Sequence, residues 1–247
     1  MIEVRDLKKV FKSTKKKVEA LKGISFKAYQ GEIFGLLGPN GAGKTTTLRI
    51  LSTMLKPTGG DALIDGISVK KNPMAVRRKI GFLSTETGLY DRLTGEETVR
   101  FFGKLSGLDD KTIKERGDYL FDSLGLSQDK KRLVSEYSTG MKQKLSIARA
   151  LIHNPEIIIF DEPTNGLDIL ATKTVTDFLR DMKEKGKTVV ISTHILDVVE
   201  KLCDRVAIIH KGEILANDTM DNLKRQHNVG SIEEVFFSLV SFEEERK

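Results

Sequence analysis

A glycine-rich turn between an apolar run and a helical pattern constrains this chain more than any other feature. The run Ile33–Leu37 contains no polar side chain, and it leads directly into GPNGAGKTT at positions 38–46. A helical pattern of apolar residues follows from Thr47. This is the G-x-x-x-x-G-K-T spacing in the setting that it requires, with a strand before the turn and a helix after it. The chain is therefore expected to be an α/β protein built around a loop that binds phosphate.

The residue types in this turn each have a physical reason. Its glycines let backbone N–H groups curl around phosphate oxygens, because no Cβ atom obstructs them. The start of the following helix adds N–H donors and a positive dipole end. Lys44 would neutralise phosphate charge, and the Thr45 hydroxyl would bind Mg²⁺. A merely flexible turn would explain neither the lysine nor the threonine. The predicted nucleotide-binding residues of the loop are Gly38, Pro39, Asn40, Gly41, Ala42, Gly43, Lys44, Thr45 and Thr46.

A second apolar run, Ile157–Phe160, ends in two acids, Asp161 and Glu162. Ligands of open α/β sheets bind at the carboxyl ends of such strands. Asp161 is expected to hold Mg²⁺ through its carboxylate, and Glu162 to orient and deprotonate an attacking water. His194 follows a third apolar run and should lie at the same edge. From the residues alone it is either a capping histidine or a contact to the γ-phosphate.

The remaining pattern predicts one domain with two sheets and a helical insertion. Continuous apolar runs are typical of parallel strands buried on both faces, and shorter β-rich runs near the start predict an antiparallel layer. Residues from about 86 to 145 are charged and helical, which indicates a lobe inserted into the core, and residues from about 220 form a short extension. The parallel runs are Ile33–Leu37, Ile157–Phe160 and Thr188–Ser192, and the antiparallel ones are Ile2–Val4, Ile24–Ala28 and Ala62–Ile64.

Composition excludes several classes of protein. No apolar run is long enough to span a bilayer and the first residues do not form a signal peptide, so the chain is expected to stay in the cytoplasm. Cys203 is the only cysteine, which excludes a disulfide framework. The net charge of +6 is spread among 35 acidic residues, and no aromatic residues interleave with the basic run near Lys15. A nucleic-acid partner is therefore not favoured.

Residues 137–144, YSTGMKQK, precede an amphipathic helical pattern and resemble the signature motif of the ABC ATPases. The run DEPT at 161–164, followed by GLD at 166–168, resembles the acid strand and the D-loop of the same family. The resemblance covers the chain from Met1 to about Ser241. It implies the family fold, which is a P-loop NTPase core with a mostly parallel sheet, an antiparallel β layer and an inserted α-helical lobe that carries the signature.

The resemblance also implies roles for single residues. Phe11 would stack on the adenine of ATP, Ser138 and Gly140 would contact a nucleotide held by a second copy, and Asp168 would reach across to that copy. Glu162 would be the catalytic base and His194 the switch histidine. Thr85 stands where the family usually has a glutamine that senses Mg²⁺ and water. Either Thr85 contacts the metal through water or Glu86 substitutes for it. Thr139 stands where glycine is usual.

The function implied by the resemblance is that of the ATP-hydrolysing subunit of a membrane transporter. Such subunits work as a homodimer with two shared ATP sites, held at the cytoplasmic face of the cell membrane by an integral membrane permease. The residues of these motifs most resemble those of sodium-extruding bacterial exporters of the NatA type, although multidrug and lipid or polysaccharide exporters have nearly the same cassette.

Two other classes of ABC-like ATPase are alternatives to the transporter subunit. A DNA-repair or chromosome-organising ATPase would place a long coiled coil between Lys44 and Ser138, and no sustained heptad is present there. A translation factor of this kind would have two fused cassettes, whereas this chain has one phosphate loop and one signature. Neither alternative fits the sequence as well as a transporter subunit does.

Overall fold

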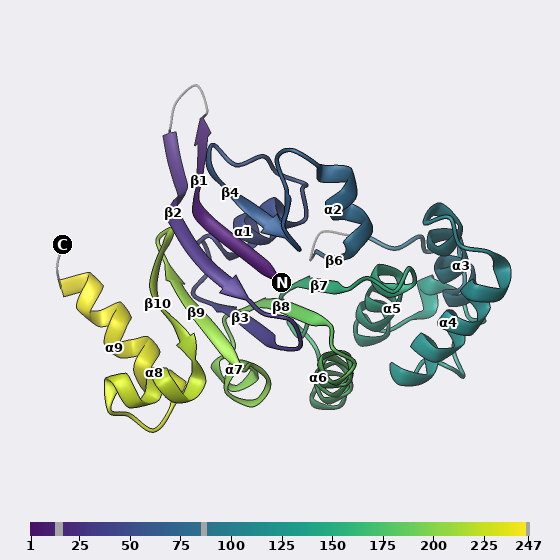
Figure 1. Cartoon of the computed structure of the whole chain (residues 1–247). Helices are drawn as coiled ribbons and strands as arrows, with labels where there is room; N and C mark the ends of the chain where they lie inside the picture. Colours follow the sequence, from purple (N-terminus) through teal and green to yellow (C-terminus); the bar gives the residue numbers. More distant parts are fainter. Residues whose placement is uncertain (13–16, 85–87, 246–247) are drawn as a thin grey trace.

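The computed structural model describes residues 1–12, 17–84 and 88–245, with side chains as far as residue 241. A six-stranded sheet forms its centre, in the order β10-β9-β3-β8-β7-β6 (Figure 1). All neighbouring strands in it are parallel except β9 and β10. The strands are β3 (Ile33–Leu37), β6 (Ile80–Leu83), β7 (Ile157–Asp161), β8 (Thr188–Thr193), β9 (Arg205–His210) and β10 (Glu213–Thr219). The three predicted parallel strands, β3, β7 and β8, are confirmed, and every residue in them is buried.

A four-stranded antiparallel sheet lies beside the central one, in the order β2-β1-β4-β5. Phe26 of this sheet stacks on Phe34 of β3 with ring centroids 4.9 Å apart, so the two sheets share one apolar interior. The predicted antiparallel layer is therefore present, and its strands are longer than the sequence pattern indicates. They are β1 (Ile2–Lys12), β2 (Lys17–Ala28), β4 (Gly59–Ile64) and β5 (Ile67–Ser68).

Helices cover the central sheet and extend the chain at its C-terminal end (Figure 1). Helix α8 packs against β10, and α9 contacts both α8 and α7. No helix in the described part of the chain is long and apolar enough to cross a bilayer. The helices outside the lobe are α1 (Lys44–Leu51), α2 (Pro73–Lys79), α6 (Ile169–Glu184), α7 (Leu196–Leu202), α8 (Met220–His227) and α9 (Ile232–Glu245).

The lobe projects from one end of the central sheet (Figure 1). It consists of α3 (Gly95–Leu105), α4 (Asp110–Ser123), a short 3₁₀ turn η1 (Val134–Glu136) and α5 (Thr139–Leu151). A capping box starts α3, because the Thr94 hydroxyl accepts from the Glu97 N–H and the Glu97 carboxylate accepts from the Thr94 N–H. Helix α5 runs past the expected edge of the lobe at about residue 145. Its last residues are buried, so one helix belongs to both the lobe and the core.

Cys203, directly after α7, shows how closely the core packs. A Cβ atom built on Gly35 of β3 would lie 2.8 Å from the Cys203 Sγ, so only glycine fits at that position. The thiol is buried, and this burial raises its pKa well above the usual range.

Candidate functional site

The phosphate loop connects β3 to α1, and close backbone packing requires its glycines. A Cβ atom on Gly38 would lie 2.1 Å from the carbonyl oxygen of Ile209. Gly43 has φ 113°, a backbone conformation that side chains disfavour, and it immediately precedes the first residue of α1. The glycine spacing seen in the sequence therefore fixes the path of the backbone from the sheet edge into the start of α1.

Lys44 is the charged centre of the loop. It is 5% exposed, and its Nζ donates to the carbonyl oxygen of Gly38 at 2.7 Å and to that of Pro39 at 3.3 Å. The same ammonium lies 3.2 Å from the Oε1 atom of Glu162. The loop thus folds around its own lysine, and the lysine joins the loop to the acid pair.

A hollow of about 350 Å³ opens above the loop. Its walls come from three segments that are distant in sequence: Ala20 on β2, residues 39–46 of the loop region, and Glu162 with Asn165. Of the predicted loop residues, Gly38 and Ala42 do not line the hollow, but both belong to the backbone that shapes it. The volume lies within the range of small-molecule sites, about 300–1,000 Å³.

Asp161 ends β7 beside the loop and is 1% exposed. Ser192 of β8 is its register partner and donates its hydroxyl proton to Asp161 Oδ1. The second oxygen, Oδ2, is buried and has no hydrogen-bond partner among the described residues. A buried carboxylate oxygen without a partner is costly unless a cation binds it. Asp161 therefore fits the hard-oxygen ligand set that Mg²⁺ requires.

Glu162 has an unusual backbone and two different carboxylate oxygens. Its φ is 50°, a left-handed conformation that costs a non-glycine residue about 1–3 kcal/mol and often marks a functional site. Oε1 accepts from His194 Nδ1 at 3.0 Å and contacts Lys44. Oε2 is buried and has no partner among the described residues. One oxygen is thus held by the protein, while the other is free to accept a proton.

The site matches a known family in sequence and in fold. The family model described as ABC transporter matches residues 21–165. The ABC transporter ATP-binding protein NatA of Bacillus subtilis is 41% identical over 239 residues, which cover 96% of this chain and 97% of the relative. This chain belongs to the ABC transporter family.

Two further relatives place the cassette within this family. The bacitracin transport ATP-binding protein BcrA of Bacillus licheniformis is 40% identical, over 92% of the cassette and 72% of the relative. A dimeric ATP-binding cassette solved in a post-hydrolysis state with ADP and phosphate superposes with a TM-score of 0.82 at 29% identity, over 89% of this chain and 98% of that one. The cassette is the ATP-binding subunit of an ABC transporter, and it hydrolyses ATP in a reaction coupled to transport.

Apart from Asp161, His194 and the loop residues already described, four predicted site residues do not line the hollow. Phe11 is 43% exposed near the end of β1, with the Lys9 ammonium 5.1 Å from its ring centroid. Ser138 caps α5 and Asp168 caps α6, each accepting a backbone N–H three residues on. Gly140 lies against α6, where a Cβ atom would be 3.2 Å from that of Ala171. Thr85 and Glu86 lie outside the described residues, so their roles stay predictions.

Three residues of the site escaped sequence reasoning. Ser192 holds Asp161 by its hydroxyl and also accepts the Glu162 N–H. Asn165 lines the hollow, and Gln143 of α5 donates to the carbonyl oxygen of Pro163 at 3.0 Å, which ties the signature helix to the acid loop. Gln143 had a signal in the sequence, because it lies within the signature motif, whereas the role of Ser192 depends on β7 and β8 being neighbours.

Proposed function

We propose that the cassette hydrolyses ATP with Glu162 as general base. The observation that supports this role is that its two carboxylate oxygens have different contacts. Lys44 and His194 hold Oε1, and Oε2 is left as a buried acceptor at the rim of the hollow. A base must be oriented before it can take a proton from water in the transition state. His194 provides that orientation and, in this proposal, also contacts the γ-phosphate.

Lys44, Thr45 and Asp161 take the phosphate and metal roles. Lys44 offers a cation and the loop offers backbone N–H donors, both of which bind phosphate oxygens. Thr45 and Asp161 would hold Mg²⁺, which neutralises charge on the phosphates when bound. Ser192 keeps the Asp161 carboxylate in place, because its hydroxyl donates to Oδ1 and leaves Oδ2 without a partner among the described residues. Phe11 remains the proposed stacking partner of adenine.

Two copies of the cassette are proposed to form two shared ATP sites. Ser138, Gly140 and Asp168 lie apart from the hollow of their own chain, and the side chains of Ser138 and Asp168 are exposed. Ile169 and Leu170, next to Asp168, are 86% and 78% exposed, which is unusual for large aliphatic residues and typical of a surface that a partner covers. A head-to-tail pair would bring one copy's signature to the other copy's loop.

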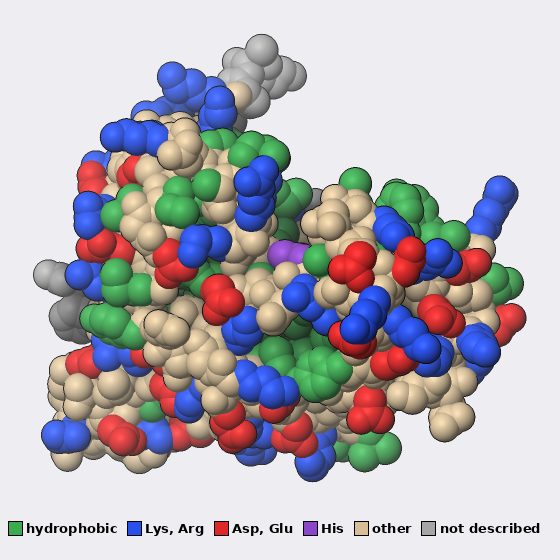
Figure 2. All heavy atoms as spheres, turned by 45° about the vertical axis from the view of Figure 1, so that its right-hand side comes forward, with side chains coloured by type: hydrophobic (Ala, Val, Ile, Leu, Met, Phe, Trp, Pro, Cys, Tyr) green, Lys and Arg blue, Asp and Glu red, His purple; other side chains and the backbone are tan. Residues whose placement is uncertain are grey.

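The lobe is the proposed contact with the integral membrane permease, at the cytoplasmic face of the cell membrane. Tyr90 and Phe101 meet edge to face with centroids 5.9 Å apart, and both are about half exposed. Arg149 of α5 supports this patch from below, donating to the Gly88 carbonyl oxygen at 3.1 Å and lying 5.1 Å from the Phe102 ring. Figure 2 shows apolar side chains on the upper surface of the lobe, among mixed basic and acidic ones. Such a surface suits a protein partner better than a nucleic acid.

The proposed contact gives a direct prediction for Tyr90→Ala. We expect transport by the assembled transporter to fall, because an aromatic anchor at the interface is lost, while ATP hydrolysis by the isolated cassette stays near normal. Tyr29→Ala, at a similarly exposed tyrosine directly after β2 and outside the lobe, is the matched control. Wild-type transport by the Tyr90→Ala variant would exclude this part of the lobe from the permease contact.

The transported substrate is proposed to be Na⁺, moved outward. The support is the similarity to NatA, which extends over nearly the full length of both chains. The bacitracin relative is almost as similar, so a drug exporter is the competing proposal. The test is to express the cassette with its permease in a sodium-sensitive host, and to measure Na⁺ efflux beside resistance to bacitracin. Efflux that is lost in the Glu162→Gln variant supports Na⁺, and resistance without efflux supports the drug exporter.

A further inference from the structure

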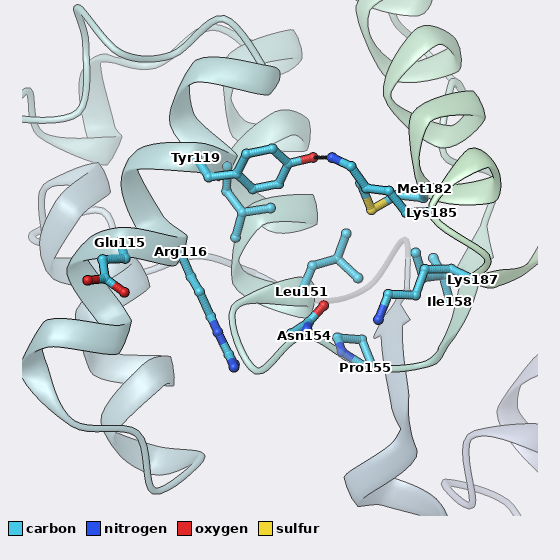
Figure 3. Close-up of a pocket in the computed structure, with 11 residues that line it drawn as sticks. Glu115, Arg116, Tyr119, Leu151, Asn154, Pro155, Ile158, Met182, Lys185 and Lys187 are labelled. Atoms are coloured by element: carbon cyan, nitrogen blue, oxygen red, sulfur yellow. Dashed lines mark hydrogen bonds between the residues drawn. The ribbon is translucent and has the colours of Figure 1, made fainter.

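A second pocket lies where the lobe meets the core, and it shares no lining residue with the phosphate-loop hollow (Figure 3). Its volume is about 290 Å³. Helix α4 of the lobe forms one wall, and the other is formed by the end of α5, the segment after it, β7, the end of α6 and the residues between α6 and β8. The pocket therefore spans the two parts of the cassette, whose relative position decides where the signature lies.

The floor of this pocket is apolar. Its side chains come from both parts and are buried, with exposed fractions between 1% and 6% where these are given. They are Leu120, Leu151, Pro155, Ile158 and Met182. An apolar body of modest size would be stabilised here by about 25 cal/mol for each Å² of apolar surface removed from water.

Arg116 supplies a cation at the rim of the same pocket. Figure 3 shows its side chain extending from α4 toward Asn154, over the edge of the apolar floor. Among the described residues its guanidinium makes no ion pair, and its one hydrogen bond is to the carbonyl oxygen of Ile152 at 3.4 Å. A guanidinium carries five N–H donors in a planar fork that matches a carboxylate. Most of its donors therefore remain for a ligand.

The two lysines of the rim are already compensated. Lys185 pairs with Asp181 at 2.7 Å, and Tyr119 donates to the same carboxylate at 2.7 Å, while Lys185 also reaches the Tyr119 hydroxyl (Figure 3). Lys187 pairs with Glu156 at 3.3 Å. Glu115 also lines the pocket, but Figure 3 shows its carboxylate directed away from the apolar floor. The charge that remains for a ligand is therefore that of Arg116, which suits a single negative charge rather than a phosphate dianion.

We propose that this pocket binds a small amphipathic carboxylate, with its acid group on Arg116 and its acyl or aryl body on the apolar floor. Tyr119 and Asp181 already tie α4 to α6 at one end of the pocket. An occupant would tie them at the other end as well, so the lobe and the core would move less freely against each other. Since the signature lies on the lobe side and the phosphate loop in the core, ATP hydrolysis would respond to the occupant.

The test is calorimetric titration of the purified chain with octanoate, which carries both the charge and the apolar body. Acetate has the charge alone and octan-1-ol has the body alone, so both should bind much more weakly. Arg116→Met keeps the apolar stem and removes the charge, and we expect it to weaken octanoate binding about tenfold or more. Lys111→Met makes the same change of charge on an exposed position of α4 outside the pocket, and it should leave binding unchanged.

Location and consequence are measured on the same samples. The methyl NMR signal of Met182 should shift with octanoate in the wild type, and its assignment follows from Met182→Leu. Steady-state ATP hydrolysis should change with octanoate in the wild type and in Lys111→Met, but not in Arg116→Met. Arg116→Gln serves as a second rim variant if Arg116→Met does not fold, and it should also weaken binding, because its amide carries no charge. The site would be overturned by the absence of saturable binding, by equal affinity in the rim variant, or by a Met182 signal that does not shift. Binding without any change in hydrolysis would overturn the regulatory part of the proposal.

Discussion

The phosphate-loop region and the signature region of the cassette are built in opposite ways. Around the loop, Lys44, Asp161 and Glu162 are buried or nearly so, and each is held by contacts within the chain. Around the signature, Ser138 is exposed and Gly140 half-buried, and neither faces the hollow. A buried region held by contacts within one chain and an exposed region apart from its own hollow are what the proposed sharing of a site between two copies requires. The difference suggests where substitutions should act within one copy and where they should act only between copies.

The largest expected effect is that of Glu162→Gln on the loop region. The amide keeps the shape of the side chain but does not accept the proton, so hydrolysis should fall about 10²–10⁴-fold, or roughly 3–5 kcal/mol of barrier. ATP binding should survive, and a dimer holding unhydrolysed ATP should accumulate in size-exclusion chromatography with Mg²⁺. Lys44→Ala is the contrasting variant and should lose nucleotide binding and dimerisation together. Hydrolysis by Glu162→Gln at the wild-type rate would exclude this residue as the base.

Gly140→Asp tests the other half of the comparison. A carboxylate placed in the signature would face the phosphates of the partner's nucleotide, so hydrolysis should fall about 10- to 100-fold, while each monomer still binds ATP. Gly140→Ala controls for the tight approach of Ala171 without adding charge. A mixture of Gly140→Asp with Lys44→Ala contains dimers with one intact shared site. It should recover activity that neither variant has alone, and a mixture without activity would show that the site is not divided in this way.

Ser192→Ala asks how far the loop region depends on contacts behind the reacting groups. The variant leaves Asp161 Oδ1 without its donor, which is worth about 1–3 kcal/mol at a buried carboxylate. We expect kcat to fall about tenfold with a smaller change in the KM for ATP, and the dependence on Mg²⁺ concentration to shift upward. Ser146→Ala removes another buried serine hydroxyl, one that bonds only to its own helix, and should leave kcat unchanged. If the two variants had the same kinetics, Ser192 would have no role in positioning Asp161.

His153 offers the smallest effect, at the joint between the lobe helix α5 and the core. Burial lowers its pKa below the ordinary 6.5, and its Nε2 donates to the Ile80 carbonyl oxygen at 3.0 Å. The unfolded chain therefore binds a proton near pH 6.5 that the folded chain does not, so the free energy of unfolding should decrease as the pH falls below that value. His153→Gln keeps a hydrogen-bond donor and should remove this pH dependence. The total change in the free energy of unfolding that is lost should be less than about 1 kcal/mol. Urea titrations between neutral and mildly acidic pH measure it, with His227→Gln as control. A slope that is the same in both variants would assign it to other groups.

Sequence reasoning reached the features that depend on local pattern. The phosphate loop, the acid pair and the strands β3, β7 and β8 each occupy one continuous segment, so period and composition were enough. Ser192 acts on Asp161 only because β7 and β8 are neighbours in a particular register. The order of the strands cannot be predicted from either segment alone, so this contact could be identified only from the structure.

The edge of the lobe, expected at about residue 145, could not be fixed from the sequence for a different reason. Helix α5 is continuous from Thr139 to Leu151, and its amphipathic pattern does not change where it passes from the lobe into the core. Strand β9 was also missed, since no motif marks the apolar run between Arg205 and His210. The pocket beside Arg116 could not be foreseen, because α4 and α6 meet there from distant parts of the chain.

The burial of Cys203 has a practical consequence for following the cassette at work. The chain has no other cysteine. Maleimide dyes react with a thiolate, and burial keeps the Cys203 thiol protonated, so the natural protein should react very little with such dyes. An exposed cysteine introduced at Met54, just after α1, or at Leu105, at the end of α3, would then take up a single fluorophore without any prior removal of native thiols. Donor and acceptor dyes on separate copies could report, one molecule at a time, when a signature approaches a loop.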